Sequence, residues 1–246
     1  MSDYPEIAAR FTRGTAGHEM AVLFDQGLYR HLRFASPDGS GYRFDLHTSP
    51  NRLMFSGEVG IYVFSVWPTV DLFKVFSESS VGDQPNFGYW TEKLAAWSEP
   101  AIQFSNDRFD AQIAHELAEG ENDWPGVTDA WTAKSSGFLA EYSFETEQAA
   151  RFAACDFSFQ ADDTESWEPA FKFSDCARWV LDDYDWRYLW ACHAALYGIG
   201  QYNAATVTEV GQAAQHFDKV PDPLDGCHWC ACGNRWPCKD AGAVAA

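Results

Sequence analysis

Four cysteines stand within twelve residues near the C-terminus, in the string CHWCACGNRWPC over residues 227–238. Their thiolates are soft ligands, and a closed structural zinc site requires four ligands. The string therefore predicts a structural zinc site whose ligands are Cys227, Cys230, Cys232 and Cys238. His228 could replace one thiolate. Two alternatives stay open, a tail of free thiols and a redox-active pair, because a single residue separates Cys230 from Cys232.

Arginine and histidine side chains gather between residues 29 and 52, a segment with a net charge of +2 in an acidic protein. Apolar and polar residues alternate in YRFDLHT (residues 42–48), which places the polar ones on the wet face of a strand. This face is the expected place for an anion such as a nucleotide phosphate. The candidate ligand-binding residues are His31, Arg33, Arg43, His47 and Arg52. The alternative is an ordinary solvated sheet face.

Two further histidines are candidates with weaker support. His115 and Glu119 lie one helical turn apart, a spacing that could bind a metal ion or shuttle a proton. No second histidine completes an H-E-x-x-H motif, and an exposed helix face explains the pair equally well. His193 lies in an aromatic helix, where we expect a hydrogen-bonded core residue.

Classical enzyme motifs are missing from the chain. It contains no G-x-x-x-x-G-K-[ST], no G-x-G-x-x-G after a strand and no G-x-S-x-G. The GIGQY string at Gly198 is expected to close a helix, so it does not form a phosphate loop. These absences disfavour classical nucleotide hydrolases, Rossmann enzymes and α/β-hydrolases.

The elements that position these residues are of two kinds. Five short strands are expected between residues 17 and 67, and their tight connections predict an antiparallel meander. The pattern then becomes mainly helical, with a mixture of strand and helix over residues 136–159. Helices are expected over VDLFKVFSE, FGYWTEKLAAW, SNDRFDAQIAHELAEG and DDYDWRYLWACHAALYGIGQY. The predicted fold is α+β, an N-terminal antiparallel meander sheet packed by helices, with a mainly helical second half and a cysteine-rich C-terminal tail.

The domain organisation follows from the same pattern. We expect one α+β globular domain over residues 1–203, sheet-rich over 17–67 and mainly helical over 69–203. Residues 204–246 are expected to form a C-terminal extension that carries the cysteine motif. No apolar run is long enough for a membrane span, and no signal segment is visible, so a cytoplasmic location is expected. The seven cysteines are then interpreted as thiols or metal ligands rather than disulfides.

The charge of the protein is concentrated in its middle. The net charge is −19, and residues 101–185 hold 5 basic and 19 acidic side chains, a net charge of −14. Such a field repels nucleic acid, so no direct nucleic-acid binding is expected. It could instead imitate a phosphate backbone and occupy a basic groove of another protein. The alternative is a solvated acidic face.

Several strings resemble a family of uncharacterised proteins from tailed phages and prophages, namely LYRHLRF, GYRFDL, GEVGIYVFS, YWTEKL and DYDWRYLWACHAALYGIGQY. The resemblance covers roughly residues 28–203, and this chain departs from the family pattern at Glu58, Val59 and Tyr197. It implies a setting in the cytoplasm of an infected host cell and no catalytic residue. We therefore expect a non-enzymatic phage accessory protein that binds and blocks a host protein, in an anti-defence role for example. The alternative is an enzyme or sequestering protein for a small phosphorylated ligand on the arginine and histidine face.

Overall fold

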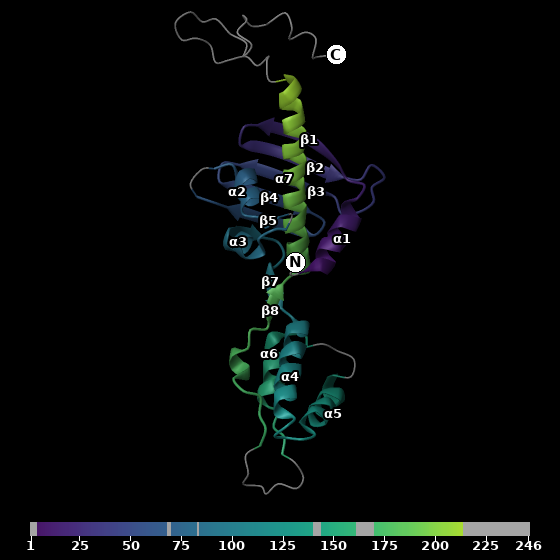
Figure 1. The fold of residues 1–246 in the computed structure, drawn as a ribbon, viewed down its shortest axis with the longest axis vertical. Coiled ribbons are helices and arrows are strands. Elements are labelled where there is room, and N and C mark those ends of the chain that lie inside the picture. Colours follow the sequence, from purple (N-terminus) through teal and green to yellow (C-terminus); the bar gives the residue numbers. More distant parts are fainter. Residues whose placement is uncertain (1–3, 68–69, 83, 140–143, 161–169, 214–246) are drawn as a thin grey trace, which may run out of the picture. The chain divides into compact units, whose positions relative to one another are not determined.

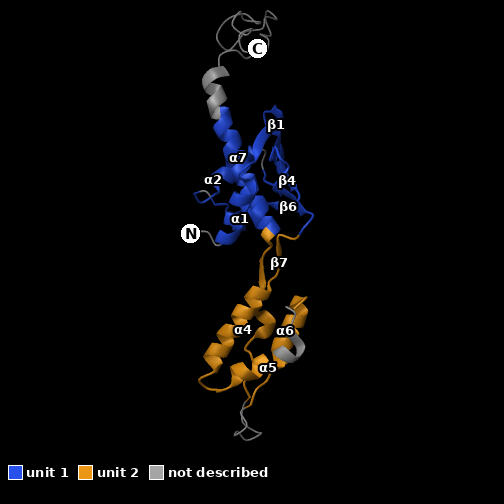
Figure 2. Ribbon diagram, turned by 90° about the vertical axis from the view of Figure 1, so that its right-hand side faces the viewer, with its two compact units in different colours: residues 1–99, 187–246 blue, residues 100–186 orange. Residues whose placement is uncertain are grey.

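The computed structural model describes residues 4–213 except 68–69, 83, 140–143 and 161–169, and confirms the predicted α+β class (Figure 1). The chain divides into two compact units (Figure 2). The first, Met1–Glu99 with Arg187–Ala246, is called the sheet unit below, and the second, Pro100–Trp186, is called the acidic unit. The sequence predicts no boundary at these positions, because the chain enters and leaves the acidic unit through short strands and not through linker-like segments.

The described part of the sheet unit contains a six-stranded sheet whose neighbours in sequence are also neighbours in space, all antiparallel. Its strands are β1 (Glu19–Gln26), β2 (Tyr29–Ala35), β3 (Phe44–Ser49), β4 (Arg52–Gly57), β5 (Gly60–Ser65) and β6 (Leu94–Trp97). The first five match the five predicted strands. The prediction of a continuous helix over FGYWTEKLAAW is wrong, because α3 (Phe87–Glu92) ends early and β6 pairs with the free edge of β5.

Helices α1 (Pro5–Thr15), α2 (Leu72–Glu78), α3 and α7 (Trp186–Ala213) supply the other half of the core of this unit. They pack on one face of the sheet, called the inner face, which consists of side chains that are at most 1% exposed: Leu32, Phe34, Phe44, Leu46, Leu53, Phe55, Tyr62 and Phe64. Alternation along each strand sends the intervening side chains to the opposite, outer face. None of the described helices, the 28-residue α7 included, combines the length and hydropathy that a membrane span needs.

Helix α7 is longer than predicted. The GIGQY string does not close it, and the helix continues through Gly198 to Ala213. A Cβ atom at Gly198 would lie 2.5 Å from Cδ1 of Leu46 and 3.0 Å from the ring of Phe34. The glycine therefore allows the helix to approach the sheet closely, and it does not mark a helix end.

One polar cluster joins the sheet to two helices. Arg30 of β2 donates two hydrogen bonds to Asp71, at 2.9 and 2.8 Å. Asp71 is also the N-cap of α2, and its Oδ1 accepts from the backbone N–H of Phe73 at 3.0 Å. The guanidinium lies over the rings of Phe73 and, on α7, of Tyr202. These contacts fix where α2 begins relative to the sheet.

The acidic unit has its own hydrophobic core. Its elements are β7 (Ile102–Phe104), α4 (Asn106–Gly120), α5 (Val127–Leu139), α6 (Glu147–Cys155), the 3₁₀ turn η1 (Cys176–Arg178) and β8 (Asp182–Tyr184). Phe109, Trp131, Phe157, Phe173 and Trp179 lie at the centre of this core. Helix α4 begins at the predicted serine cap, where Ser105 Oγ accepts from the N–H of Arg108. The antiparallel pair β7–β8 was not predicted, and an isolated bridge joins Phe159, at the end of the segment predicted to mix strand and helix, to Phe171.

The interpretation of all cysteines as thiols or metal ligands is wrong for one pair. Cys155 at the end of α6 and Cys176 in η1 form a disulfide within the acidic unit. Spacing alone does not reveal the pair, because the two cysteines are 21 positions apart in the sequence and tertiary packing brings them together. Cys192 is a free and fully buried thiol, as interpreted, and burial raises its pKa well above the ordinary range.

Candidate functional site

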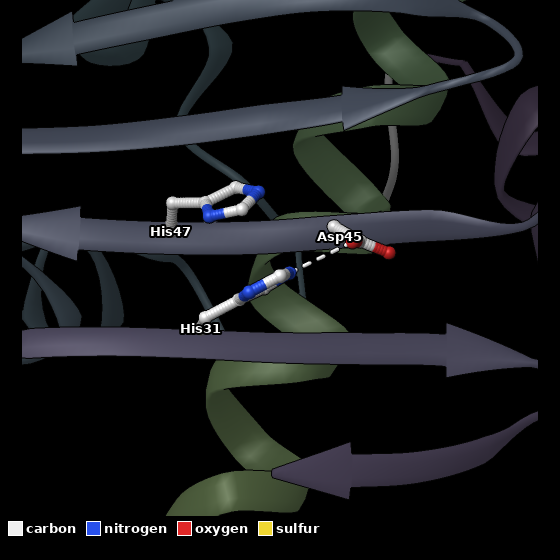
Figure 3. Close-up of side chains that lie close together, drawn as sticks. All are labelled: His31, Asp45 and His47. Atoms are coloured by element: carbon white, nitrogen blue, oxygen red, sulfur yellow. Dashed lines mark hydrogen bonds and ion pairs between the residues drawn. The ribbon is translucent and has the colours of Figure 1, made fainter. Parts of the chain in front are cut away.

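The outer face of the sheet brings together four polar side chains from the adjacent strands β2 and β3. The register places His31 opposite His47 and Arg33 opposite Asp45. The alternate residues Leu32 and Leu46 are fully buried on the inner face. The polar side chains therefore project away from α7, as Figure 3 shows for the two histidines and the aspartate. We call His31, Arg33, Asp45 and His47 the His–Asp cluster.

The carboxylate of Asp45 is the centre of this cluster. Its Oδ2 accepts a hydrogen bond from His31 Nε2 at 2.8 Å. Arg33 donates from Nε to Oδ1 at 3.0 Å and from Nη2 to Oδ2 at 2.9 Å, a bidentate ion pair. The rings of His31 and His47 stack with centroids 4.0 Å apart. The cluster is thus held by hydrogen bonds, charge and ring contact at once.

Partial burial shapes the ionisation of the cluster. Burial acts to raise the pKa of Asp45, but the hydrogen bonds and charges of Arg33 and His31 outweigh it, so this pKa lies below its usual value. Burial, aided by the nearby charge of His31, lowers the pKa of His47 below its usual value. At neutral pH, Asp45 is therefore an anion and His47 a neutral imidazole.

The structure brings together three of the five residues predicted to bind an anion. His31, Arg33 and His47 lie in the cluster, whereas Arg43 is exposed just before β3. Arg52 is exposed at the start of β4, opposite Ser49, and contacts none of the cluster in the described hydrogen bonds and ion pairs. Arg33 already forms an ion pair with Asp45. A carboxylate at the centre makes this face less suited to a phosphate than the sequence suggests.

Asp45 is the candidate site residue that sequence reasoning did not select. The alternation Asp45-Leu46-His47 predicts that this aspartate shares a face with His47. Its contact with His31 and Arg33 depends on the register between β2 and β3. That register follows from the position of the intervening loop and from inner-face packing, neither of which is visible in a spacing pattern.

The other candidates are less organised. His115 Nε2 and Glu119 Oε1 are 3.7 Å apart, and the two side chains are 63% and 70% exposed, as expected for a pair on a solvated helix face. His193 is buried beside the rings of Phe11 and Phe87, which agrees with the predicted core position. The cysteines at 227, 230, 232 and 238 lie outside the described residues.

The second candidate feature is the charge of the acidic unit. Pro100–Trp186 contains all the residues of the acidic segment 101–185, and therefore carries −14 of the net charge of −19. Many of its carboxylates are exposed, among them Asp107, Asp110, Asp123 and Asp175. Although Asp110 on α4 is exposed as a residue, partial desolvation of its carboxyl and the neighbouring charge of Asp107 raise its pKa.

The raised pKa of Asp110 predicts a pH-dependent cost to stability. A carboxyl whose pKa is higher in the folded than in the unfolded state lowers the free energy of unfolding when it is ionised. This loss of stability is absent at low pH, where the carboxyl is protonated, and is complete once the pH has risen through the folded pKa. Asp110→Asn should therefore raise the melting temperature at pH 7, less so in high salt, because salt screens Asp107. Asp123→Asn, in the loop after α4, is the matched control. A melting temperature unchanged or lowered by Asp110→Asn would contradict the repulsion.

A scan against protein-family models and searches of curated proteins and of solved structures found no match to the chain.

Proposed function

We propose that the protein is a phage accessory protein that binds and blocks a host protein, and that the acidic unit makes the contact. One observation carries the proposal. Most of the net charge is confined to a unit that has its own core, its own disulfide and its own strand pair. A surface that only keeps the protein in solution does not need its negative charges gathered in one unit. Gathering them has a cost, because repulsion between like charges destabilises a compact unit. The phage setting rests on the sequence resemblance described above.

The charge indicates the kind of partner. An acidic surface attracts a basic one and raises the rate of encounter. Basic grooves are typical of proteins that bind nucleic acid, whose phosphates they neutralise. A host protein of this kind, for example one that acts in defence against phage DNA, would be blocked when the acidic unit occupies its groove. The proposed location is accordingly the host cell cytoplasm.

A binding role without catalysis agrees with the described residues. The most organised polar group, the His–Asp cluster, lies on an open sheet face, with side-chain exposures of 29% for His31 and 41% for Arg33. Catalytic acid–base groups are usually enclosed, which strengthens the fields they feel. The alternative, a small phosphorylated ligand on this face, is less favoured because Arg33 is already paired with Asp45.

The test is an affinity pull-down from infected bacterial cells with the full-length chain as bait. We expect capture of a host protein with a basic surface, released by raising the salt concentration, because exposed charge pairs are screened by salt. A parallel screen measures melting temperature against a panel of nucleotides and sugar phosphates. Capture of no host protein, together with a melting shift from a phosphorylated metabolite, would overturn the proposal in favour of the alternative.

A further inference from the structure

We propose that His31, Asp45 and His47 bind a divalent transition-metal ion, zinc in the first place, on the outer face of the sheet. One ligand atom from each side chain lies within 4.8 Å of the ligand atoms of the other two. Figure 3 shows the three side chains converging from β2 and β3 on the same side of the sheet. The site is built from residues of the sheet unit and shares no residue with the cysteine motif.

The ligand set selects the class of ion. Two imidazoles and one carboxylate suit zinc and its first-row neighbours, whereas calcium and magnesium prefer sites built from oxygen ligands alone. Zinc bonds of about 2.0–2.2 Å place neighbouring ligand atoms roughly 3.3 Å apart. His31 Nε2 and Asp45 Oδ2 are already 2.8 Å apart. A ring nitrogen of His47, which lies within 4.8 Å of these two atoms, must move closer to both. A rotation of the His47 side chain can bring it there without movement of the strands.

The surrounding residues support the three ligands. Leu32 and Leu46, fully buried on the inner face, anchor the strands from which the ligands project. Arg33 orients the Asp45 carboxylate through two hydrogen bonds. An ion between His31 and Asp45 would replace the hydrogen bond between them and would share Oδ2 with Arg33 Nη2, while Arg33 Nε would keep its bond to Oδ1 as an outer support.

The site is open toward solvent. The side chains of His31 and Asp45 are 29% and 13% exposed, so both reach the surface of the outer face. Three protein ligands leave at least one coordination position of a tetrahedral ion for water or an external donor. Exposed apolar side chains of the same outer face lie near this position, with Phe24 of β1 directly opposite His31 in the register. The ion would therefore present its free position on a surface that can contact another molecule.

The experiment separates this site from the cysteine motif. Zinc and cobalt are titrated into the full-length chain with Cys227→Ser, Cys230→Ser, Cys232→Ser and Cys238→Ser, so that no thiolate of the tail motif can contribute. We expect one ion per chain, and a cobalt spectrum with ligand-field bands but without thiolate charge-transfer bands. His31→Gln, Asp45→Asn and His47→Gln in that background should each weaken binding by at least about tenfold, the loss typical of a residue that only supports a ligand.

His115→Gln is the matched control, because it removes an exposed histidine from the acidic unit and should leave affinity unchanged. Circular dichroism and melting without metal check that each variant is folded, which is expected because all three side chains are on the open face. The proposal is overturned if the tail variant binds neither ion. It is equally overturned if folded His31, Asp45 and His47 variants bind with the affinity of their parent.

Discussion

Trp190→Ala is expected to destabilise the sheet unit by about 3–5 kcal/mol, the range for deleting a large aromatic side chain from a core. The Trp190 side chain is fully buried in α7. Its ring lies 5.3–6.2 Å, centroid to centroid, from four aromatic rings of α1, β3, β4 and the chain before β3: Phe11, Tyr42, Phe44 and Phe55. Alanine would remove aromatic contacts that join α7 to β3 and β4.

The measurement is native-state hydrogen exchange, which reports the free energy of opening for each segment. Amides of β3 and β4 should exchange faster in Trp190→Ala, while those of α4, in the separately packed acidic unit, should not change. Trp190→Phe is the control. The indole Nε1–H is buried without an acceptor among the described residues, so phenylalanine removes an unsatisfied donor while it keeps most of the ring. An equal loss in the free energy of opening of β3 and β4 in Trp190→Ala and Trp190→Phe would contradict the packing described.

Gly198→Ala is expected to destabilise the protein, although alanine is the better helix former. The new methyl group would meet Leu46 at 2.5 Å and Phe34 at 3.0 Å, and both residues are fully buried. Overpacking of a core costs about 1–3 kcal/mol, which exceeds the gain in helix propensity of about 1 kcal/mol.

Gly200, two residues further along the same helix, provides the matched comparison. Its Cβ position has no atom within 4 Å and the residue is exposed. Gly200→Ala should therefore stabilise the protein by roughly 0.5–1 kcal/mol, because alanine has the higher helix propensity and its methyl group meets no neighbouring atom. Urea titration of the two variants measures the difference. If Gly198→Ala is as stabilising as Gly200→Ala, α7 does not approach the sheet as closely as the structure shows.

Local sequence patterns predict the helices and strands of this fold better than they predict its division into two units. The alternation in YRFDLHT correctly separates buried Phe44 and Leu46 from outward Asp45 and His47. Strand β6 was missed because its four residues gain their stability from pairing with β5, which a local pattern does not contain. The disulfide between Cys155 and Cys176 and the insertion of the acidic unit were missed for the same reason. Each depends on residues that are distant in sequence and adjacent in space.

The two candidate features, the acidic unit and the His–Asp cluster, differ in how far the sequence predicts them. The concentration of acidic residues over 101–185 is visible from composition, and the structure adds that the segment folds as a compact unit. The His–Asp cluster is only half visible, because periodicity gives the face but not the register that sets Asp45 beside Arg33. The arginine and histidine content predicts an anion site, whereas the proposed cation site depends on the carboxylate that the register places beside two imidazoles.

The most direct test of the acidic unit as the binding surface is the salt dependence of association with the captured host protein. The association rate is measured by stopped flow for three full-length chains as salt is raised. They are the unaltered chain, the chain with Asp110→Asn, Asp123→Asn and Asp175→Asn, and a control with Glu19→Gln, Glu58→Gln and Glu99→Gln. Both triple variants remove three exposed negative charges, from the acidic unit in one case and from the sheet unit in the other.

The unaltered chain should associate roughly tenfold or more faster at low salt than at high salt, because its field steers the encounter. The acidic-unit variant should associate more slowly at low salt and with a flatter salt dependence, and the sheet-unit control should follow the unaltered chain. One salt dependence shared by all three chains would contradict the assignment of binding to the acidic unit.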